Sequence, residues 1–141
     1  MKLRKILEQI ILENNEYFQE LESNWKRFGD NIHIPSNYQV FKKKKKIPAL
    51  KNKLCYLNSL NRAKEDPDVK LAIGILVANK PNSQGYIDKT FHGWNIVNGY
   101  VEDCTLGNTS GIYIGRIIDN VNPLSDGSDV RSLLFKDLKI S

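Results

Sequence analysis

The N-terminal part of the chain repeats its apolar residues with the period of an amphipathic helix. Between residues 2 and 28 one stripe with a spacing of three to four is formed by Leu3, Leu7, Ile10, Asn14, Tyr17, Leu21 and Phe28. Charged side chains fall mainly off this stripe. The pattern predicts an N-terminal amphipathic helix within residues 1–30 that packs on its own domain. The alternative is a homodimer in which two such helices pair and Asn14 sets the register.

Residues 31–50 lose this period. They contain two prolines and an unbroken run of five lysines, which are Lys42, Lys43, Lys44, Lys45 and Lys46. Because like charges repel, the run favours an extended and solvated basic loop. The alternative is a binding site for nucleic acid or an acidic partner, since such a run neutralises several phosphates. The loop lacks the interleaved aromatic residues that single-strand binding surfaces use.

From residue 51 onward one helical pattern is followed by strand-like alternation. Residues 51–64 have helical spacing and end at Glu65-Asp66-Pro67-Asp68. Four strands are predicted, at Val69–Ala78, Thr90–Asn98, Gly99–Thr105 and Gly111–Ile118. Residues 130–138 fit a terminal helix or a strand-like tail. One helix followed by an antiparallel sheet predicts an α+β core over residues 51–141.

Composition limits the class of protein. The chain has 141 residues, enough for a single domain 1–141 with a core. Hydrophobic residues at 40% and charged residues at 26% exclude disordered and fibrous classes. No apolar run approaches the roughly 20 residues that span a bilayer, so no membrane partner is expected. We expect a cytoplasmic protein in which the two cysteines are thiols.

Charge is concentrated in the N-terminal part of the chain. The net charge is +5, and residues 1–50 carry ten Lys and Arg against six Asp and Glu. Residues 51–141 carry eleven against ten and are nearly neutral. The basic excess therefore lies outside the part of the chain that carries the candidate chemistry.

Three polar residues have settings that suit a cysteine hydrolase. Cys55 opens a helical run, His92 lies in an alternating strand, and Asp103 ends a second strand that is reached through Asn98-Gly99. A helix N-terminus and an adjacent imidazolium lower a thiol pKa from near 8.5 to roughly 3.5–7.5. The pattern therefore predicts Cys55 as nucleophile, His92 as general base and Asp103 as the carboxylate that orients the imidazole.

Strand alternation selects the carboxylate. His92, Trp94 and Ile96 share one face of their strand. Across a tight Asn-Gly turn Asp103 pairs near residues 93–94, within reach of His92. Glu102 then points to the opposite face, so Asp103 is preferred over Glu102.

The segments CYLNS, AIGILV, HGWN, VEDCT and IYIG occur in this order. This order resembles small, often phage-encoded cysteine hydrolases of the papain-like and transglutaminase-like group. The resemblance covers about residues 52–118 and implies a papain-like or transglutaminase-like core, with the nucleophile helix packed on an antiparallel sheet. It implies Cys55, His92 and Asp103 as the triad and Asn58 as the motif asparagine. A phage-encoded protein of this kind acts in the host cytoplasm.

Supporting residues are less well defined by the sequence. Asn52 and Asn58 are the nearest side-chain amides to Cys55 and are the candidates for oxyanion donors. Each of them is also a candidate helix cap or helix surface residue. Trp94 is a candidate for the substrate pocket beside His92, or for the core.

The predicted function is a cysteine hydrolase or acyl transferase that acts on an amide, isopeptide or carboxamide bond of a protein or peptide-like substrate. The alternative is a non-catalytic phage or bacterial binding protein that recruits or inhibits a host macromolecule. A zinc site formed by Cys55, His92 and Cys104 is disfavoured, because the sequence has no C-x-x-C or H-x-x-x-H pair. No cofactor is expected.

Overall fold

The computed structural model describes residues 34–52, 54–79, 83–84, 88–107 and 111–139. The helix expected within residues 1–30, and with it the homodimer contact, lies outside these ranges. The described part contains five strands: β1 Gln39–Phe41, β2 Val69–Val77, β3 Lys89–Val97, β4 Tyr100–Glu102 and β5 Ile112–Ile118. Its two helices are α3 Cys55–Glu65 and α4 Gly127–Asp137.

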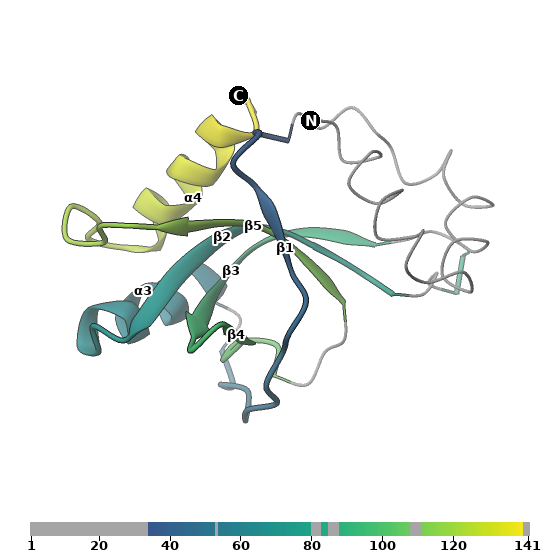
Figure 1. The fold of residues 1–141 in the computed structure, drawn as a ribbon, viewed down its shortest axis with the longest axis horizontal. Coiled ribbons are helices and arrows are strands. Elements are labelled where there is room, and N and C mark those ends of the chain that lie inside the picture. The colour runs from purple at the N-terminus through teal and green to yellow at the C-terminus, as the bar shows by residue number, and fades with distance from the viewer. Residues whose placement is uncertain (1–33, 53, 80–82, 85–87, 108–110, 140–141) are drawn as a thin grey trace.

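The strands form one curved sheet in the order β1-β5-β2-β3-β4, with antiparallel neighbours throughout (Figure 1). The β3–β4 hairpin turns through Asn98 and Gly99, whose φ angles are 52° and 81°. Two positive φ angles are typical of the tight hairpin turns that Asn-Gly favours. The predicted turn is therefore confirmed, and it fixes the register in which Asn95 pairs with Glu102.

One segment of the chain reaches both edges of this sheet. Strand β1 pairs with β5 at one edge, where Val40 lies opposite Ile114. A few residues later Lys44 forms a parallel bridge with Val101 of β4, at the other edge. Two backbone hydrogen bonds hold this bridge, from Lys45 N to Val101 O at 2.9 Å and from Val101 N to Lys43 O at 2.8 Å. Residues 39–45 therefore cross the open side of the curved sheet and give the fold its half-barrel form.

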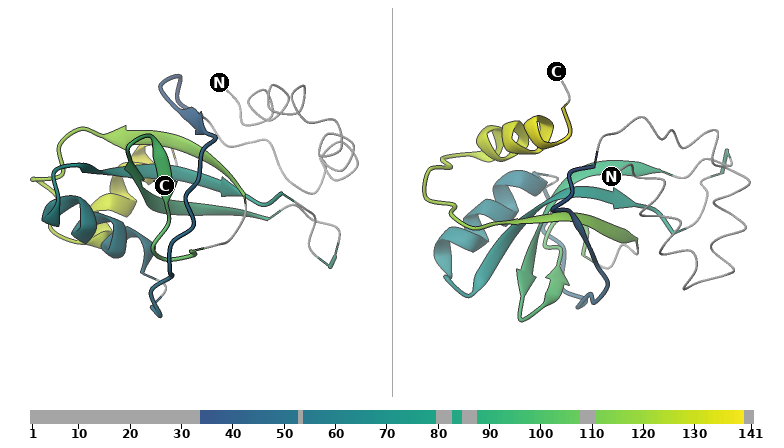
Figure 2. Two further views of the ribbon diagram at one scale, coloured as in Figure 1. Left: turned by 60° about the horizontal axis from the view of Figure 1, so that its bottom comes forward. Right: turned by 45° about the horizontal axis from the view of Figure 1, so that its top comes forward.

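Both faces of the sheet are buried, and each has its own core. Helices α3 and α4 cover one face (Figure 2). The core on this side includes Leu60, Leu71, Ile73, Ile75, Ile114, Val130 and Leu134. The opposite face lines the interior of the half-barrel and buries Ala72, Leu76, Trp94, Ile96, Val101 and Tyr113. Strand alternation sends neighbouring residues of β2 and β5 to different cores.

The prediction of an α+β domain with a papain-like or transglutaminase-like core is wrong for the described part of the chain. That part is mostly β, with a five-stranded antiparallel half-barrel and two helices of 11 residues each. Residues 31–50 account for part of the error. Their prolines and lysines favoured a solvated loop, whereas residues 39–45 pair with β5 and β4. Strands β2, β3 and β5 lie where alternation predicted them, whereas β4 ends at Glu102 and not at Thr105. Of the two alternatives for residues 130–138, the structure has the helix, which spans Gly127–Asp137.

No helix in the described ranges is both long enough and apolar enough to cross a membrane.

Candidate active site

Cys55 is the first residue of α3, and the residues before it explain why the helix begins there. The side-chain oxygen of Asn52 accepts a hydrogen bond from Leu54 N at 3.1 Å and so satisfies a backbone donor ahead of the first turn. Helical bonding then begins with Asn58 N donating to Leu54 O at 2.9 Å. The N–H groups of the first turn have no acceptor within the helix and point out of its positive end. The position of Cys55 at this end of the helix therefore stabilises the negative charge of a thiolate.

Helix α3 packs unusually close to β3 at Gly93. A Cβ atom at this position would lie 3.0 Å from Ser59 Oγ and 3.2 Å from Tyr56 Cδ1. Ser59 fits this contact because its hydroxyl donates back to Cys55 O at 2.6 Å within the helix. On its sheet side the helix buries Asn58 and Ser59 together with Leu60, and this brings Cys55 to the edge of β3.

His92 and Asp103 form a buried pair on the interior face of the half-barrel. His92 Nε2 lies 2.7 Å from Asp103 Oδ2, and the two residues are 2% and 0% exposed. Strand β4 ends at Glu102, so Asp103 sits at the start of a turn and faces the ring. Glu102 faces elsewhere and pairs with Arg62 at 3.0 Å. The carboxylate beside His92 is therefore that of Asp103.

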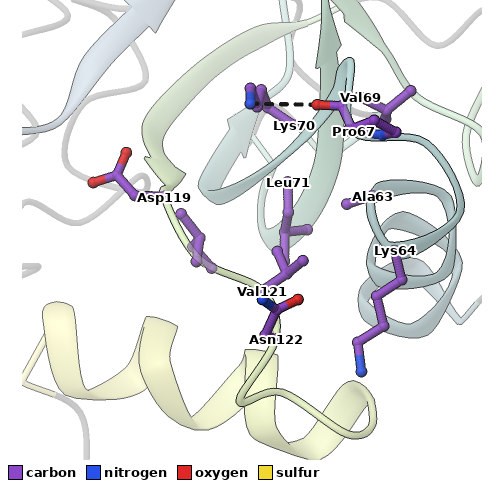
Figure 3. Close-up of a pocket in the computed structure, with 10 residues that line it drawn as sticks. Ala63, Lys64, Pro67, Val69, Lys70, Leu71, Asp119, Val121 and Asn122 are labelled. Carbon is purple, nitrogen blue, oxygen red and sulfur yellow. Dashed lines mark hydrogen bonds between the residues drawn. The ribbon is translucent and has the colours of Figure 1, made fainter.

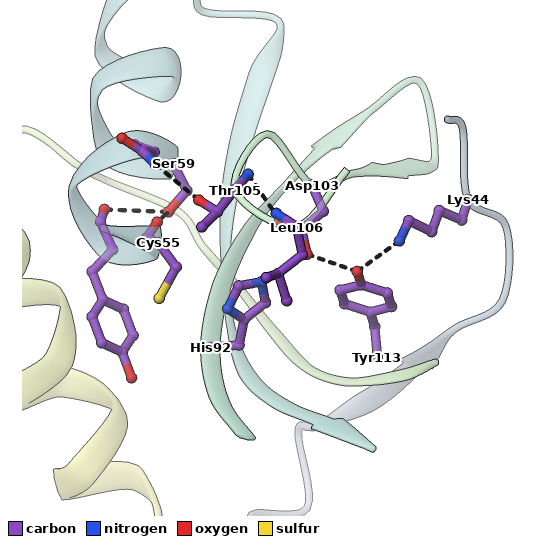
Figure 4. Close-up of polar contacts among 10 residues, drawn as sticks. Lys44, Cys55, Ser59, His92, Asp103, Thr105, Leu106 and Tyr113 are labelled. Carbon is purple, nitrogen blue, oxygen red and sulfur yellow. Dashed lines mark hydrogen bonds and ion pairs between the residues drawn. The ribbon is translucent and has the colours of Figure 1, made fainter. Parts of the chain in front are cut away.

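Four groups surround the Asp103 carboxylate. Oδ1 accepts hydrogen bonds from Thr105 N at 3.1 Å and Leu106 N at 3.0 Å. Oδ2 accepts the Tyr113 hydroxyl at 2.7 Å and faces His92 (Figure 4). Burial alone would raise the pKa of this carboxyl. The hydrogen bond and charge of His92, with the other donors, instead hold its pKa at about 2. Asp103 is therefore ionised at neutral pH.

The Cys55 thiol lies beside the other edge of the His92 ring (Figure 4). With Nε2 facing Asp103, the remaining nitrogen Nδ1 is left for the sulfur. Burial would raise the pKa of Cys55, but the hydrogen bond and charge of His92 and the N–H of Gly93 together lower it. Burial would lower the pKa of His92, but Asp103 and Cys55 raise it to about 9. These opposite shifts favour a thiolate–imidazolium pair around neutral pH.

The two asparagines connect segments of the chain. Asn58 Nδ2 donates to Asn52 Oδ1 at 2.8 Å and to Thr105 Oγ1 at 2.9 Å, which uses both of its hydrogens. This buried amide ties α3 to the turn that carries Asp103. Because both hydrogens of Asn58 are used, the first-turn N–H groups, including that of Cys55, stand beside the Asn52 amide as candidate oxyanion donors.

Trp94 is an interior residue in this structure. It is 1% exposed and packs edge-on against Phe41 and Tyr113, with the His92 ring stacked beside it at 6.1 Å between centroids. Its side chain supports the ring of His92 from within the half-barrel and does not line the surface beside Cys55.

Sequence reasoning missed two residues of this cluster. Lys44 Nζ donates to the Tyr113 hydroxyl at 2.9 Å, and that hydroxyl donates to Asp103. The other four lysines of the run are exposed. In the sequence the run reads as a uniform basic stretch, and only the bridge between Lys44 and Val101 turns its third member inward. Tyr113 faces the interior because it alternates with the helix-facing Ile114 on β5.

A hollow of about 420 Å³ opens beside Cys55. It is lined by Leu54, Cys55, Tyr56, Leu57, Gly127, Ser128 and Arg131, from the first turns of α3 and α4. A second hollow of about 450 Å³ lies at the opposite end of α3, between Lys64, Pro67 and Asn122 (Figure 3). The second hollow contains none of the three candidate catalytic residues. Of these two hollows, the one that reaches Cys55 lies on the side of α4.

Within the described ranges, no three His, Cys, Asp or Glu side chains form a group that could hold a metal ion. Cys104, the third member of the disfavoured zinc set, is buried, and this burial raises its pKa. No protein-family model matches the chain, and no curated protein and no solved structure matches it either. The resemblance to cysteine hydrolases therefore stays a prediction based on short motifs.

Proposed function

We propose that the protein is a cysteine-dependent hydrolase or acyl transferase that cleaves an amide-type bond through a thioester on Cys55. The observation that carries the proposal is the continuous chain of contacts from the Cys55 thiol through His92 to the buried Asp103 carboxylate. A thiol at a helix start, an imidazole and a buried carboxylate together supply the three roles of a nucleophilic acyl transfer.

The reaction follows from the protons that these groups hold. The Cys55 thiolate attacks the carbonyl carbon, a C–S bond forms, and the carbonyl π electrons move to oxygen. The imidazolium of His92 gives its Nδ1 proton to the leaving nitrogen as the C–N bond breaks, which leaves a thioester and a neutral imidazole. Water or an acceptor amine then attacks the thioester and gives a proton to Nδ1 as the C–S bond breaks. Asp103 stays ionised throughout and holds the ring through Nε2.

The surroundings of Cys55 support the remaining requirements. The backbone N–H of Cys55 itself, at the positive end of α3, stabilises the oxyanion. The acyl side of the substrate occupies the hollow between α3 and α4, whose lining combines apolar carbon from Leu54 and Leu57 with the cation of Arg131. This lining suits a protein or peptide-like acyl group that carries an acidic side chain. The exposed lysines at 42, 43, 45 and 46 stay a predicted contact for an acidic partner or nucleic acid.

A non-specific acyl donor tests the proposal without knowledge of the substrate. Incubation with p-nitrophenyl acetate at pH 7 is expected to acetylate Cys55 rapidly, as seen by peptide mass spectrometry, and the adduct is expected to decay by hydrolysis. Cys104 provides the internal control because it is buried with a raised pKa. In His92→Ala the acetylation of Cys55 is expected to slow by at least about 100-fold, the usual scale of general acid–base assistance.

Acetylation of Cys55 that is slow, or that survives intact in His92→Ala, would contradict the proposal. The binding-protein alternative would then account for the chain.

A further inference from the structure

Lys44 lies at the back of the candidate site and is less exposed than the other four lysines of the run. Lys44 is half-buried, its ammonium group donates to the Tyr113 hydroxyl at 2.9 Å and lies 5.0 Å from the centre of that ring. Burial lowers the pKa of Lys44, and the charge of Asp103 opposes this effect. Desolvating a lysine is unfavourable unless partners compensate for it, so this placement calls for a physical reason.

We propose that Lys44 and Tyr113 are positioning residues of the active site, which hold the Asp103 carboxylate toward His92 Nε2 and balance its charge. This inference rests on the proposed function. The Tyr113 hydroxyl donates to Oδ2, the same oxygen that faces His92. Its single proton is therefore committed to Asp103, and its lone pairs accept from Lys44. Lys44 in this way fixes the direction of the Tyr113 hydroxyl, and Tyr113 fixes the carboxylate.

The backbone explains why this lysine and no other occupies the position. Residues that pair across strands project to the same side of the sheet, and Lys44 bridges Val101, which faces the interior. Asp103 projects to the same side as Val101, two residues further on. Residues 39–45, which close the half-barrel, thus place the Lys44 ammonium group on the far side of the Asp103 carboxylate.

The charged and titratable groups around Asp103 come from several segments of the chain. The groups around Asp103 are His92 from β3, Cys55 from α3, Tyr113 from β5, and Glu102 and Cys104 from its own segment. Glu102 is paired with Arg62 at 3.0 Å, which compensates for its charge. Lys44, which reaches Asp103 through the Tyr113 hydroxyl, supplies the positive charge on the other side of the carboxylate.

The expected effect of removing this charge has a definite sign. A nearby cation stabilises the thiolate and destabilises the imidazolium, so its loss raises the pKa of both Cys55 and His92. For a unit charge acting at an effective dielectric of about 20, screened by solvent, the expected shift is about one pH unit. In Lys44→Met the alkylation of Cys55 by iodoacetamide should therefore begin about one pH unit higher than in the unmodified protein.

Three further variants separate positioning from a merely structural role. Lys44→Arg retains the charge and is expected to restore the profile to within a few tenths of a pH unit. Lys45→Met removes an equal charge from an exposed neighbour and should leave the profile unchanged. In a Tyr113→Phe background the hydroxyl that holds Lys44 is absent, so Lys44→Met should shift the profile by less than half as much. Thermal melting verifies that each variant is folded.

The inference is overturned if Lys44→Met overlays the unmodified profile, if Lys45→Met shifts it equally, or if Lys44→Arg behaves like Lys44→Met. It is also overturned if Tyr113→Phe leaves the effect of Lys44→Met undiminished. Failure of the proposed function would give a different result. Cys55 of the unmodified protein would then be alkylated only at a pH near the pKa of an ordinary thiol.

Discussion

Replacement of Asp103 by Asn is expected to lower the pKa of His92 by about two pH units. The hydrogen bond from His92 to Asp103 is the largest effect that raises this pKa, which lies at about 9 against an ordinary 6.5. At about 1.4 kcal/mol per pH unit, a two-unit fall corresponds to about 3 kcal/mol of lost imidazolium stabilisation. The fall brings the pKa of His92 to about 7, so at pH 7 the ring would change from almost fully charged to about half charged.

An asparagine cannot reproduce the hydrogen bonds of the carboxylate. Two donors, His92 Nε2 and the Tyr113 hydroxyl, face Oδ2, and two backbone N–H groups face Oδ1. An amide places its NH₂ group against one of these pairs, so donors face donors in either orientation. The variant is therefore expected to be less stable as well as less able to hold a charged imidazole.

NMR titration of the imidazole carbons measures this pKa directly. The chain has only two histidines, His33 and His92, so one His33→Gln spectrum assigns both signals. Glu102→Gln is the matched control, because that carboxylate pairs with Arg62 rather than with the ring. A His92 that still titrates near pH 9 in Asp103→Asn would refute the electrostatic reasoning, and so would an equal fall in the Glu102 variant.

Three other perturbations test separate parts of the account. Asn58→Ala removes the side-chain hydrogen bonds to Asn52 and to Thr105, the second of which ties α3 to the turn after Asp103, and should lower the free energy of unfolding by about 1–3 kcal/mol in urea titrations; an unchanged free energy would contradict this role. Asp103, with its pKa lowered from 3.8 to about 2, contributes stability that is present above pH 3.8 and lost as the pH falls through 2. This amounts to about 2 kcal/mol, and unfolding curves of Asp103→Asn that keep the same acid dependence would contradict it. Arg131→Gln should reduce the rate at which Cys55 reacts with an anionic thiosulfonate reagent relative to a cationic one, because Arg131 lines the hollow beside the thiol; an unchanged ratio would exclude Arg131 from that role.

Local patterns in the sequence were sufficient to locate most of the regular elements and the main polar cluster. Alternation predicted β2, β3 and β5, and the Asn98-Gly99 turn set the register between β3 and β4. Alternation along the hairpin also separates Asp103 from Glu102, and the structure has Asp103 beside His92 and Glu102 beside Arg62. These inferences depend on near neighbours in sequence, for which strand geometry leaves few choices.

The fold class was not predictable in the same way. Its half-barrel form depends on residues 39–45, which pair with β5 at one edge and β4 at the other. Long-range pairing of this kind has no local signature, and five identical lysines conceal which of them faces inward. The buried face of helix α3 also depends on contacts with residues far away in the sequence. Its sheet face carries Asn58 and Ser59 because a close approach at Gly93 and a bond to Thr105 outweigh apolar burial.

The most direct test of the central claim is the pH dependence of alkylation at Cys55 by iodoacetamide, with Cys104 as the internal control. The lowered pKa of Cys55 and the raised pKa of His92 predict rapid labelling of Cys55 well below pH 8, and His92→Ala should abolish this labelling at low pH. Cys104 should label slowly at every pH, since it is buried and its pKa is raised. Labelling of Cys55 that rises only near pH 8.5, with or without His92, would show an ordinary thiol and contradict the account.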